Sequence, residues 1–153
     1  RHHTRSQAIE LAKHALELRP DVVFGADLIA GFPTETDVMH QNTLDAVTEM
    51  ELLHLHVFPY SEREGTPSVK MPSIAMDIRK DRALQLRNAG EQILSDYMGT
   101  QLGAISDVLV EKGNRGLNPQ FVPVKLKSDC EAGELIKVQI SGHTDGELIG
   151  ARI

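Results

Sequence analysis

The chain has very little cysteine and no long apolar run: Cys130 is the single cysteine among 153 residues. One cysteine excludes an intrachain disulfide and any metal site built from cysteines alone. A free thiol is compatible with the reducing cytoplasm, where we expect the protein to reside. No apolar stretch approaches the ~20 residues of a membrane-spanning helix. The first residues also lack an initiator Met and a signal-peptide pattern, so we expect a further segment upstream.

An excess of positive charge is absent as well. The formal net charge is −6, which gives no overall attraction toward nucleic acid. Residues 103–153 carry six Lys and Arg side chains against seven Asp and Glu side chains. Charge alone therefore favours a small module with a structural role, and any contact with RNA would depend on a local cluster of basic side chains.

Residues 4–60 alternate between helix and strand patterns. Thr4 and Gln7 can form a capping box, and an amphipathic helix is expected behind them until Arg19-Pro20-Asp21. The nearly continuous apolar run 22–30 predicts a strand covered on both faces. A second helix, capped by Thr36, and a second strand are expected over 37–50 and 53–58. This order is typical of βαβ units in a parallel sheet, whose other strands we expect upstream.

The pattern changes after a connector at 61–73 and a helix expected over 74–98. In this helix one face is apolar, whereas the basic side chains are expected largely elsewhere; these positions are Leu86, Gly90, Ile93 and Tyr97 against Arg79, Lys80, Arg82 and Arg87. Short strands separated by Gly-containing turns predict a small antiparallel β-barrel. The strands are expected over 105–110, 120–127, 135–140 and 147–152. The predicted domains are 1–73, 74–99 and 100–153.

Two segments lie where strands of the first region end, and ligands bind at the carboxyl ends of parallel strands. In the segment 27–35, Gly31 would let a ligand approach the backbone, and Glu35 could accept hydrogen bonds from it. The alternative is a tight turn, with Glu35 favoured by the helix dipole. In the segment 55–67, Arg63 could bind a carboxylate or phosphate, or belong to a solvated charge run.

Two further patterns have competing interpretations. His54 and His56 share one strand face and could bind a metal, although polar side chains on a strand face are the simpler interpretation because no third ligand is nearby in the sequence. The segment 111–124 combines Lys112 and Arg115 with exposed amides and Phe121, which suits phosphate contact and base stacking.

These segments, in this order, resemble the C-terminal part of the radical S-adenosylmethionine methylthiotransferases. Residues 27–35 resemble the family segment D-x-I-x-G-F-P-G-E-T, although Thr34 stands where the family commonly has Gly. Residues 55–67 resemble L-H-V-F-P-Y-S-x-R-x-G-T-P, and residues 111–124, with Gly133 and Gly150, resemble the TRAM domain. The sequence His-Val-Phe-Pro-Tyr-Ser is most similar to that of the branch acting on N6-threonylcarbamoyladenosine at position 37 of tRNA.

The resemblance implies the end of a partial (β/α) barrel of radical S-adenosylmethionine type, followed by an OB-like TRAM barrel. It also implies two [4Fe-4S] clusters and S-adenosylmethionine, which together supply a 5′-deoxyadenosyl radical, sulfur and a methyl group for C2 of the adenine. The family's cluster cysteines have no counterpart here, so we expect neither catalytic residues nor metal ligands in this chain and no activity from it alone. Transferred by motif, the S-adenosylmethionine site would include Ile29, Gly31, Glu35, Val57, Phe58, Tyr60 and Arg63. The tRNA contact would include Lys112, Arg115, Asn118, Phe121 and Lys125.

Three alternatives remain at this point. One is a stand-alone TRAM-type RNA-binding protein whose α/β part is a vestigial scaffold. Another is a methylthiotransferase of the branch acting on isopentenyladenosine in tRNA or on a ribosomal protein. The third is a metal protein that uses His54 and His56. For the methylthiotransferase interpretation we expect a monomer, and for the basic cluster of the barrel we expect salt-sensitive binding to tRNA.

Overall fold

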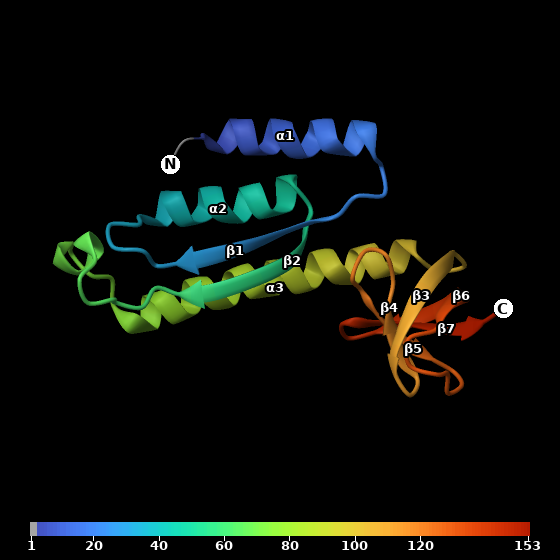
Figure 1. Ribbon diagram of the computed structural model, residues 1–153. Helices are drawn as coiled ribbons and strands as arrows, with labels where there is room; N and C mark the ends of the chain where they lie inside the picture. Colours follow the sequence, from blue (N-terminus) through green and yellow to red (C-terminus); the bar gives the residue numbers. More distant parts are fainter. Residues whose placement is uncertain (1–2) are drawn as a thin grey trace. The chain divides into compact units, whose positions relative to one another are not determined.

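The computed structural model describes residues 3–153, which form two compact units (Figure 1). The α/β unit extends to Ile93 and the barrel unit comprises Leu94–Ile153. Helix α3, Met76–Thr100, contributes residues to both units. The domain ranges predicted from the sequence, which place this helix between two domains, stay a prediction. The α/β unit also contains α1 (Arg5–Leu18), β1 (Phe24–Ala30), α2 (Asp37–Glu49), β2 (Leu52–Pro59) and the short helix η1 (Pro67–Lys70).

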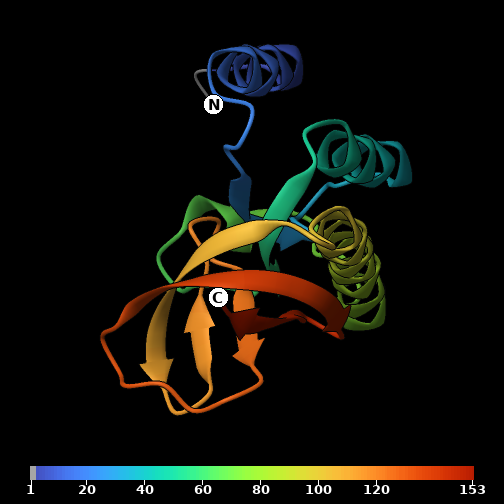
Figure 2. The ribbon, with the colours of Figure 1, turned by 90° about the vertical axis from the view of Figure 1, so that its right-hand side faces the viewer.

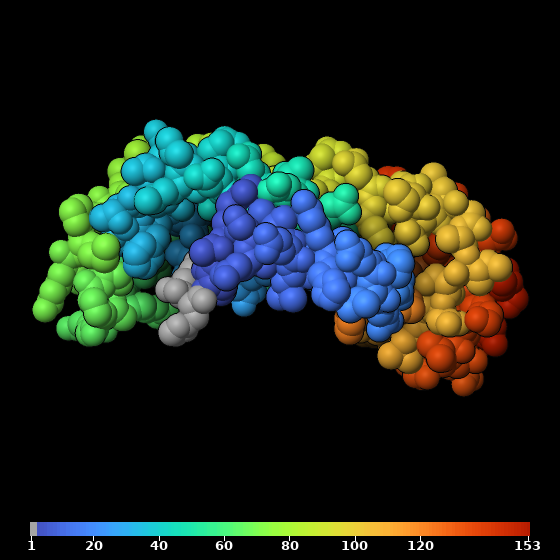
Figure 3. Space-filling model, turned by 90° about the horizontal axis from the view of Figure 1, so that it is seen from above, coloured from blue at the N-terminus to red at the C-terminus, as the bar shows by residue number. Residues whose placement is uncertain are grey.

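Two helices of the α/β unit begin at the caps that the sequence predicts. The Thr4 side chain accepts from the Gln7 backbone while the Gln7 side chain accepts from the Thr4 backbone, which completes the capping box. Thr36 caps α2 by accepting from the Met39 N–H. α1 and α2 lie against each other (Figure 3), and the Arg5–Glu49 ion pair at 2.6 Å joins them. No helix in residues 3–153 combines the length and the apolar character that crossing a membrane requires.

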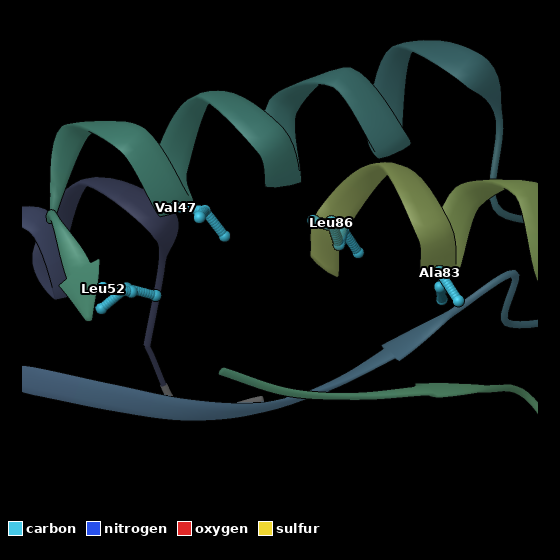
Figure 4. Packing of buried hydrophobic residues seen from close by; sticks show 5 residues of the cluster. Val47, Leu52, Ala83 and Leu86 are labelled. Atoms are coloured by element: carbon cyan, nitrogen blue, oxygen red, sulfur yellow. The ribbon is translucent and has the colours of Figure 1, made fainter. Parts of the chain in front are cut away.

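The two strands of the α/β unit pair in parallel, as predicted, with Ala26 opposite Leu55 and Leu28 opposite Val57. α2 and α3 lie on the same side of this sheet (Figure 2). Side chains from both helices are directed toward the strands and form the core with them (Figure 4); the buried members are Ala30, Val47, Leu52, Ala83 and Leu86. The prediction that residues 22–30 are covered on both faces is wrong for the described chain, because both helices pack on one face and the other stays exposed.

α3 packs through the apolar face that the sequence predicts, but with two basic residues added to it. Gly90 is buried, and a Cβ there would lie 2.9 Å from the Leu55 side chain, so a glycine allows the helix to approach the sheet. Arg79 and Arg82, expected largely on another face, are only 5% and 6% exposed. That expectation is wrong because the guanidinium groups find partners in the loops beside the sheet, which compensates for their burial.

The second unit is a closed barrel with the strand order β3-β4-β5-β7-β6. Its strands are β3 (Ile105–Lys112), β4 (Arg115–Leu117), β5 (Pro123–Leu126), β6 (Leu135–Thr144) and β7 (Glu147–Arg152). The sequence predicted a small barrel but missed β4, whose three residues include Gly116 and follow the turn at Gly113. The predicted antiparallel pairing is wrong for one pair, because β5 and β7 are parallel. A closed ring of five strands cannot alternate direction throughout, so one pair must be parallel.

Candidate functional site

The uncovered face of the sheet carries an apolar pair beside polar side chains. Ile29 of β1 and Phe58 of β2 are opposite each other in the register and are 59% and 55% exposed. The preceding pair on this face is Asp27 opposite His56. Side chains alternate between the faces of a strand, so these residues form one surface. Within residues 3–153 no group of three or more His, Cys, Asp or Glu is placed to hold a metal ion.

The loop after β1 is closed by a buried ion pair. The Glu35 carboxylate accepts from the Gly31 N–H at 2.9 Å and from the Arg82 guanidinium at 2.8 Å. Arg82 also donates to the Glu35 carbonyl and to the Asp37 carboxylate, at 2.9 and 2.6 Å. Burial by itself would lower the pKa of Arg82, but the hydrogen bonds to Asp37 and Glu35 outweigh it and raise the pKa. Glu35 therefore holds its own loop in shape.

Gly31 has a position that no other residue type fits well. Its φ is +72°, in the left-handed region that glycine favours. A Cβ at this position would lie 2.7 Å from Arg79 Cγ and 3.0 Å from Arg79 Cα. The sequence explained this glycine by the approach of a ligand to the backbone, whereas the neighbour present in the structure is the α3 backbone and the Arg79 stem.

Arg79 holds the end of β2 in place by hydrogen bonds and an ion pair, as Arg82 holds the loop after β1. Its guanidinium donates to the Tyr60 carbonyl at 3.1 Å and pairs with Glu62 at 3.3 Å, while Ser73 lies within hydrogen-bond contact. The pKa of the Glu62 carboxyl is lowered, mainly by the hydrogen bond from the Ser73 hydroxyl and secondly by the hydrogen bond from Arg79. Arg79 and Arg82 lie one turn apart on α3, so a single helix positions both loops at the carboxyl edge of the parallel strands.

Tyr60 is the buried aromatic residue at this edge. Its ring meets Phe32 edge-on at a centroid distance of 5.3 Å, and the Arg79 guanidinium lies 5.3 Å from the ring centroid. Its hydroxyl is buried without a hydrogen-bond partner among the described residues. A buried hydroxyl normally has a partner, which makes this atom a candidate for contact with a ligand or water.

The structure places the residues predicted for the first site in four different locations. Ile29 and Phe58 lie together on the uncovered face, and Gly31, Glu35 and Tyr60 lie at the strand ends beside it. The Val57 side chain packs on the opposite face against the core. Arg63 is exposed in the connector. The two arginines were missed, although their spacing of three residues on α3 and the acids in both loops are visible in the sequence.

A separate groove of about 460 Å³ lies between α2 and α3 and was not predicted. Its acidic lining includes Asp37, Asp77 and Asp81, partly neutralised by Arg82. His40 contributes a buried ring whose Nε2 lies 3.0 Å from Gln85 Oε1. Because its lining comes from the two helices, the groove is distinct from the exposed strand pair Ile29 and Phe58.

Thr34, the departure from the family motif, is predicted to cost stability. Its φ is +73°, and it is exposed. A β-branched residue is strained in this region, so Thr34→Gly should raise the free energy of unfolding of the α/β unit by about 0.5–1 kcal/mol after the added flexibility of the unfolded chain is counted. Hydrogen exchange of residues 31–36 measures this. Thr34→Ala keeps the unfavourable φ and should gain less; an equal gain would contradict the explanation.

In the barrel, the predicted RNA contacts fall on the end of β3, on β4 and β5 and on the loop between β4 and β5. Arg115 is opposite Lys125 on the neighbouring strand, and Lys112 is opposite Arg115 on the other side. Arg115 also pairs with Glu147 at 3.3 Å. Phe121 is 71% exposed, whereas Asn118 is buried at 5% exposure. The predicted exposure of the Asn118 amide is therefore wrong, because its oxygen accepts backbone hydrogen bonds within the loop.

Comparison with known proteins identifies proteins that are similar to this chain in sequence. No protein-family model matches it. It is similar to the threonylcarbamoyladenosine tRNA methylthiotransferase MtaB of Rickettsia prowazekii, with 43% identity over 97% of this chain and 35% of the relative. It is also similar to the tRNA-2-methylthio-N(6)-dimethylallyladenosine synthases of Bacillus subtilis and Geobacillus thermodenitrificans, with 32% and 37% identity over the whole chain and 33% and 28% of the relatives. The chain thus spans about a third of the length of these relatives, and the resemblance seen in the motifs is confirmed.

Proposed function

Because the chain is a homologue of the tRNA methylthiotransferases, we propose that it supplies the C-terminal part of an enzyme that adds a methylthio group to C2 of N6-threonylcarbamoyladenosine at position 37 of tRNA. The observation that carries the choice of substrate is the difference in identity. The relative named for threonylcarbamoyladenosine is 43% identical, and those named for dimethylallyladenosine are 32% and 37% identical. The wording of residues 55–67 supports the same branch.

The residues of the uncovered face suit a nucleoside-type cofactor. Ile29 and Phe58 form an exposed apolar surface on which an adenine ring could pack. The unpartnered Tyr60 hydroxyl lies at the edge of the same sheet. S-adenosylmethionine, when bound, would supply the radical and the methyl group. In this proposal Ile29 and Phe58 hold its adenosine part, while Arg79 and Arg82 keep the two neighbouring loops in place.

The proposal assigns the second unit to tRNA. A closed five-stranded barrel is compatible with the TRAM module that the motifs indicate. Arg115 on β4 lies opposite Lys125 on β5, with Lys112 opposite Arg115 on the other side, and this small basic cluster supplies the local charge that the composition lacks. The catalytic clusters would depend on cysteines that this sequence does not contain.

Mass spectrometry of tRNA nucleosides tests this function directly. Deleting the gene in the source organism should abolish 2-methylthio-N6-threonylcarbamoyladenosine, and N6-threonylcarbamoyladenosine should accumulate in its place. Restoring the gene should restore the modified nucleoside. Loss of the methylthio derivative of isopentenyladenosine would assign the protein to the other tRNA branch. An unchanged nucleoside profile would contradict the proposal and favour a stand-alone RNA-binding protein.

A further inference from the structure

The loop between β4 and β5 presents an aromatic ring to solvent from a strained backbone. Phe121 has a φ of +58° and is 71% exposed. Bulky residues other than glycine, asparagine and aspartate are uncommon in this conformation. The left-handed backbone at Phe121 costs free energy, so this conformation persists only if the surrounding residues hold it in place.

That support comes from the buried amide of Asn118. Its Oδ1 accepts from the Val122 N–H at 2.8 Å and from the Gln120 N–H at 3.1 Å. The Phe121 N–H donates to the Asn118 carbonyl at 2.9 Å, and Val122 is fully buried in the barrel. The backbone on both sides of Phe121 is therefore fixed. Strain that persists because its surroundings determine it is common at binding sites.

Exposed side chains continue along β5 from the ring. Phe121, Pro123, Lys125 and Lys127 are exposed and alternate with buried residues. Pro123 and Lys125 lie within β5, where residues two apart on the outside are about 6.6–6.8 Å from each other, and Phe121 and Lys127 flank the strand. Among residues 3–153, neither lysine of this row forms an ion pair. Lys112 at the end of β3 also forms no ion pair in this part of the chain, whereas three other cations of the strands pair with acids; they are Arg115, Lys137 and Arg152. The row thus combines a fixed aromatic ring with unpaired positive charge.

We propose that Phe121 stacks on an unpaired nucleobase of single-stranded RNA, whose phosphates are contacted by Lys125 and Lys127. Base stacking needs an exposed ring and adjacent positive charge for the backbone, and both are present. In a duplex the bases are already stacked and paired, so the ring discriminates in favour of unpaired RNA. This inference rests on the proposed function for its choice of RNA, and it identifies the region of tRNA contacted as a single-stranded one.

Fluorescence anisotropy with the full chain and a labelled single-stranded RNA of about ten nucleotides tests the inference, because alanine substitution of a stacking aromatic typically weakens binding by roughly 5- to 150-fold per base. Phe121→Asn should weaken binding about tenfold without loss of folding, since asparagine tolerates the left-handed backbone. Phe121→Tyr should bind like the unchanged chain. Leu135→Asn is the matched control, because Leu135 is also 71% exposed but lies on β6, and its affinity should not change.

Salt dependence separates the ring from the lysines. Lys125→Gln should reduce the slope of log affinity against log salt by about 0.7, because one phosphate contact is lost, whereas Phe121→Asn should leave the slope unchanged. Duplex RNA of the same length should bind more weakly, and Phe121→Asn should remove that preference. Equal affinity of Phe121→Asn and the unchanged chain, or no binding of single-stranded RNA, overturns the inference. The nucleoside profile after gene deletion reports on the proposed function independently of both results.

Discussion

Arg82→Met is expected to lower the free energy of unfolding of the α/β unit by about 3 kcal/mol, because removal of one partner leaves the other charge buried and unpaired. Arg82 donates to the carboxylates of Glu35 and Asp37 at 2.8 and 2.6 Å. Without it, the mostly buried Glu35 side chain would keep only the Gly31 N–H as a partner. Methionine fills the space of the arginine stem, so the loss reports the interactions of the guanidinium rather than a cavity.

Hydrogen exchange with peptide resolution measures this effect on the α/β unit separately from the barrel. Arg19→Met is the matched control, because Arg19 also pairs with a carboxylate, that of Asp21, but at an exposed position. Exposed pairs contribute little, so this variant should keep its protection. Adding Glu35→Gln to Arg82→Met should recover part of the loss, since the unpaired charge disappears. If Arg82→Met and Arg19→Met exchange alike, the closure of the loop by Arg82 is not a stabilising interaction.

Gly31→Ala is expected to destabilise the same unit by about 2–4 kcal/mol, through two separate effects. The first is the left-handed backbone, with φ +72°. The second is the collision of the new Cβ with Arg79, whose Cγ and Cα would lie 2.7 and 3.0 Å away. Since Arg79 holds the Tyr60 carbonyl and Glu62, its displacement should also expose the connector behind β2. Hydrogen exchange should therefore increase at both strand ends.

Gly65→Ala separates these two effects. Gly65 has a φ of +83°, and a Cβ there would meet no atom within 4 Å. It should lose only the backbone contribution, about 1 kcal/mol. The difference between the two variants then measures the close approach of α3 to the loop after β1. If Gly31→Ala and Gly65→Ala lower the free energy of unfolding equally, α3 moves away from the new Cβ without an energetic cost.

The secondary structure of the α/β unit was largely predictable because its signals are local. The capping box of Thr4 and Gln7 and the cap at Thr36 depend on residues three positions apart, and the structure contains both. The short strand β4, Arg115–Leu117, was missed because Gly116 is typical of turns. In the structure this glycine is needed inside the barrel, where a Cβ would lie 2.3 Å from the Leu109 carbonyl oxygen. A requirement of that kind depends on a neighbouring strand.

The position of the candidate site was predictable from sequence motifs, but the contacts of its side chains were not. The sequence indicated that Ile29, Gly31 and Phe58 lie near strand ends, and the register places Ile29 opposite Phe58. It assigned Glu35 to a ligand, whereas Glu35 is engaged by Arg82, 47 residues further along the chain. It expected an exposed Asn118, which the structure buries to fix the Phe121 loop. In each case a partner distant in sequence, or the path of the backbone, changes what a polar side chain does.

By itself, the sequence determined the order of helices and strands apart from η1 and β4, the parallel pairing of β1 with β2 and the kinship with tRNA methylthiotransferases. These follow from local periodicity, caps and motifs of neighbouring residues. Only the tertiary structure decided that the two arginines of α3 are buried clamps and that one strand pair of the barrel is parallel. The burial of a charge depends on partners brought together by folding, and the direction of the last pair depends on closure of the ring.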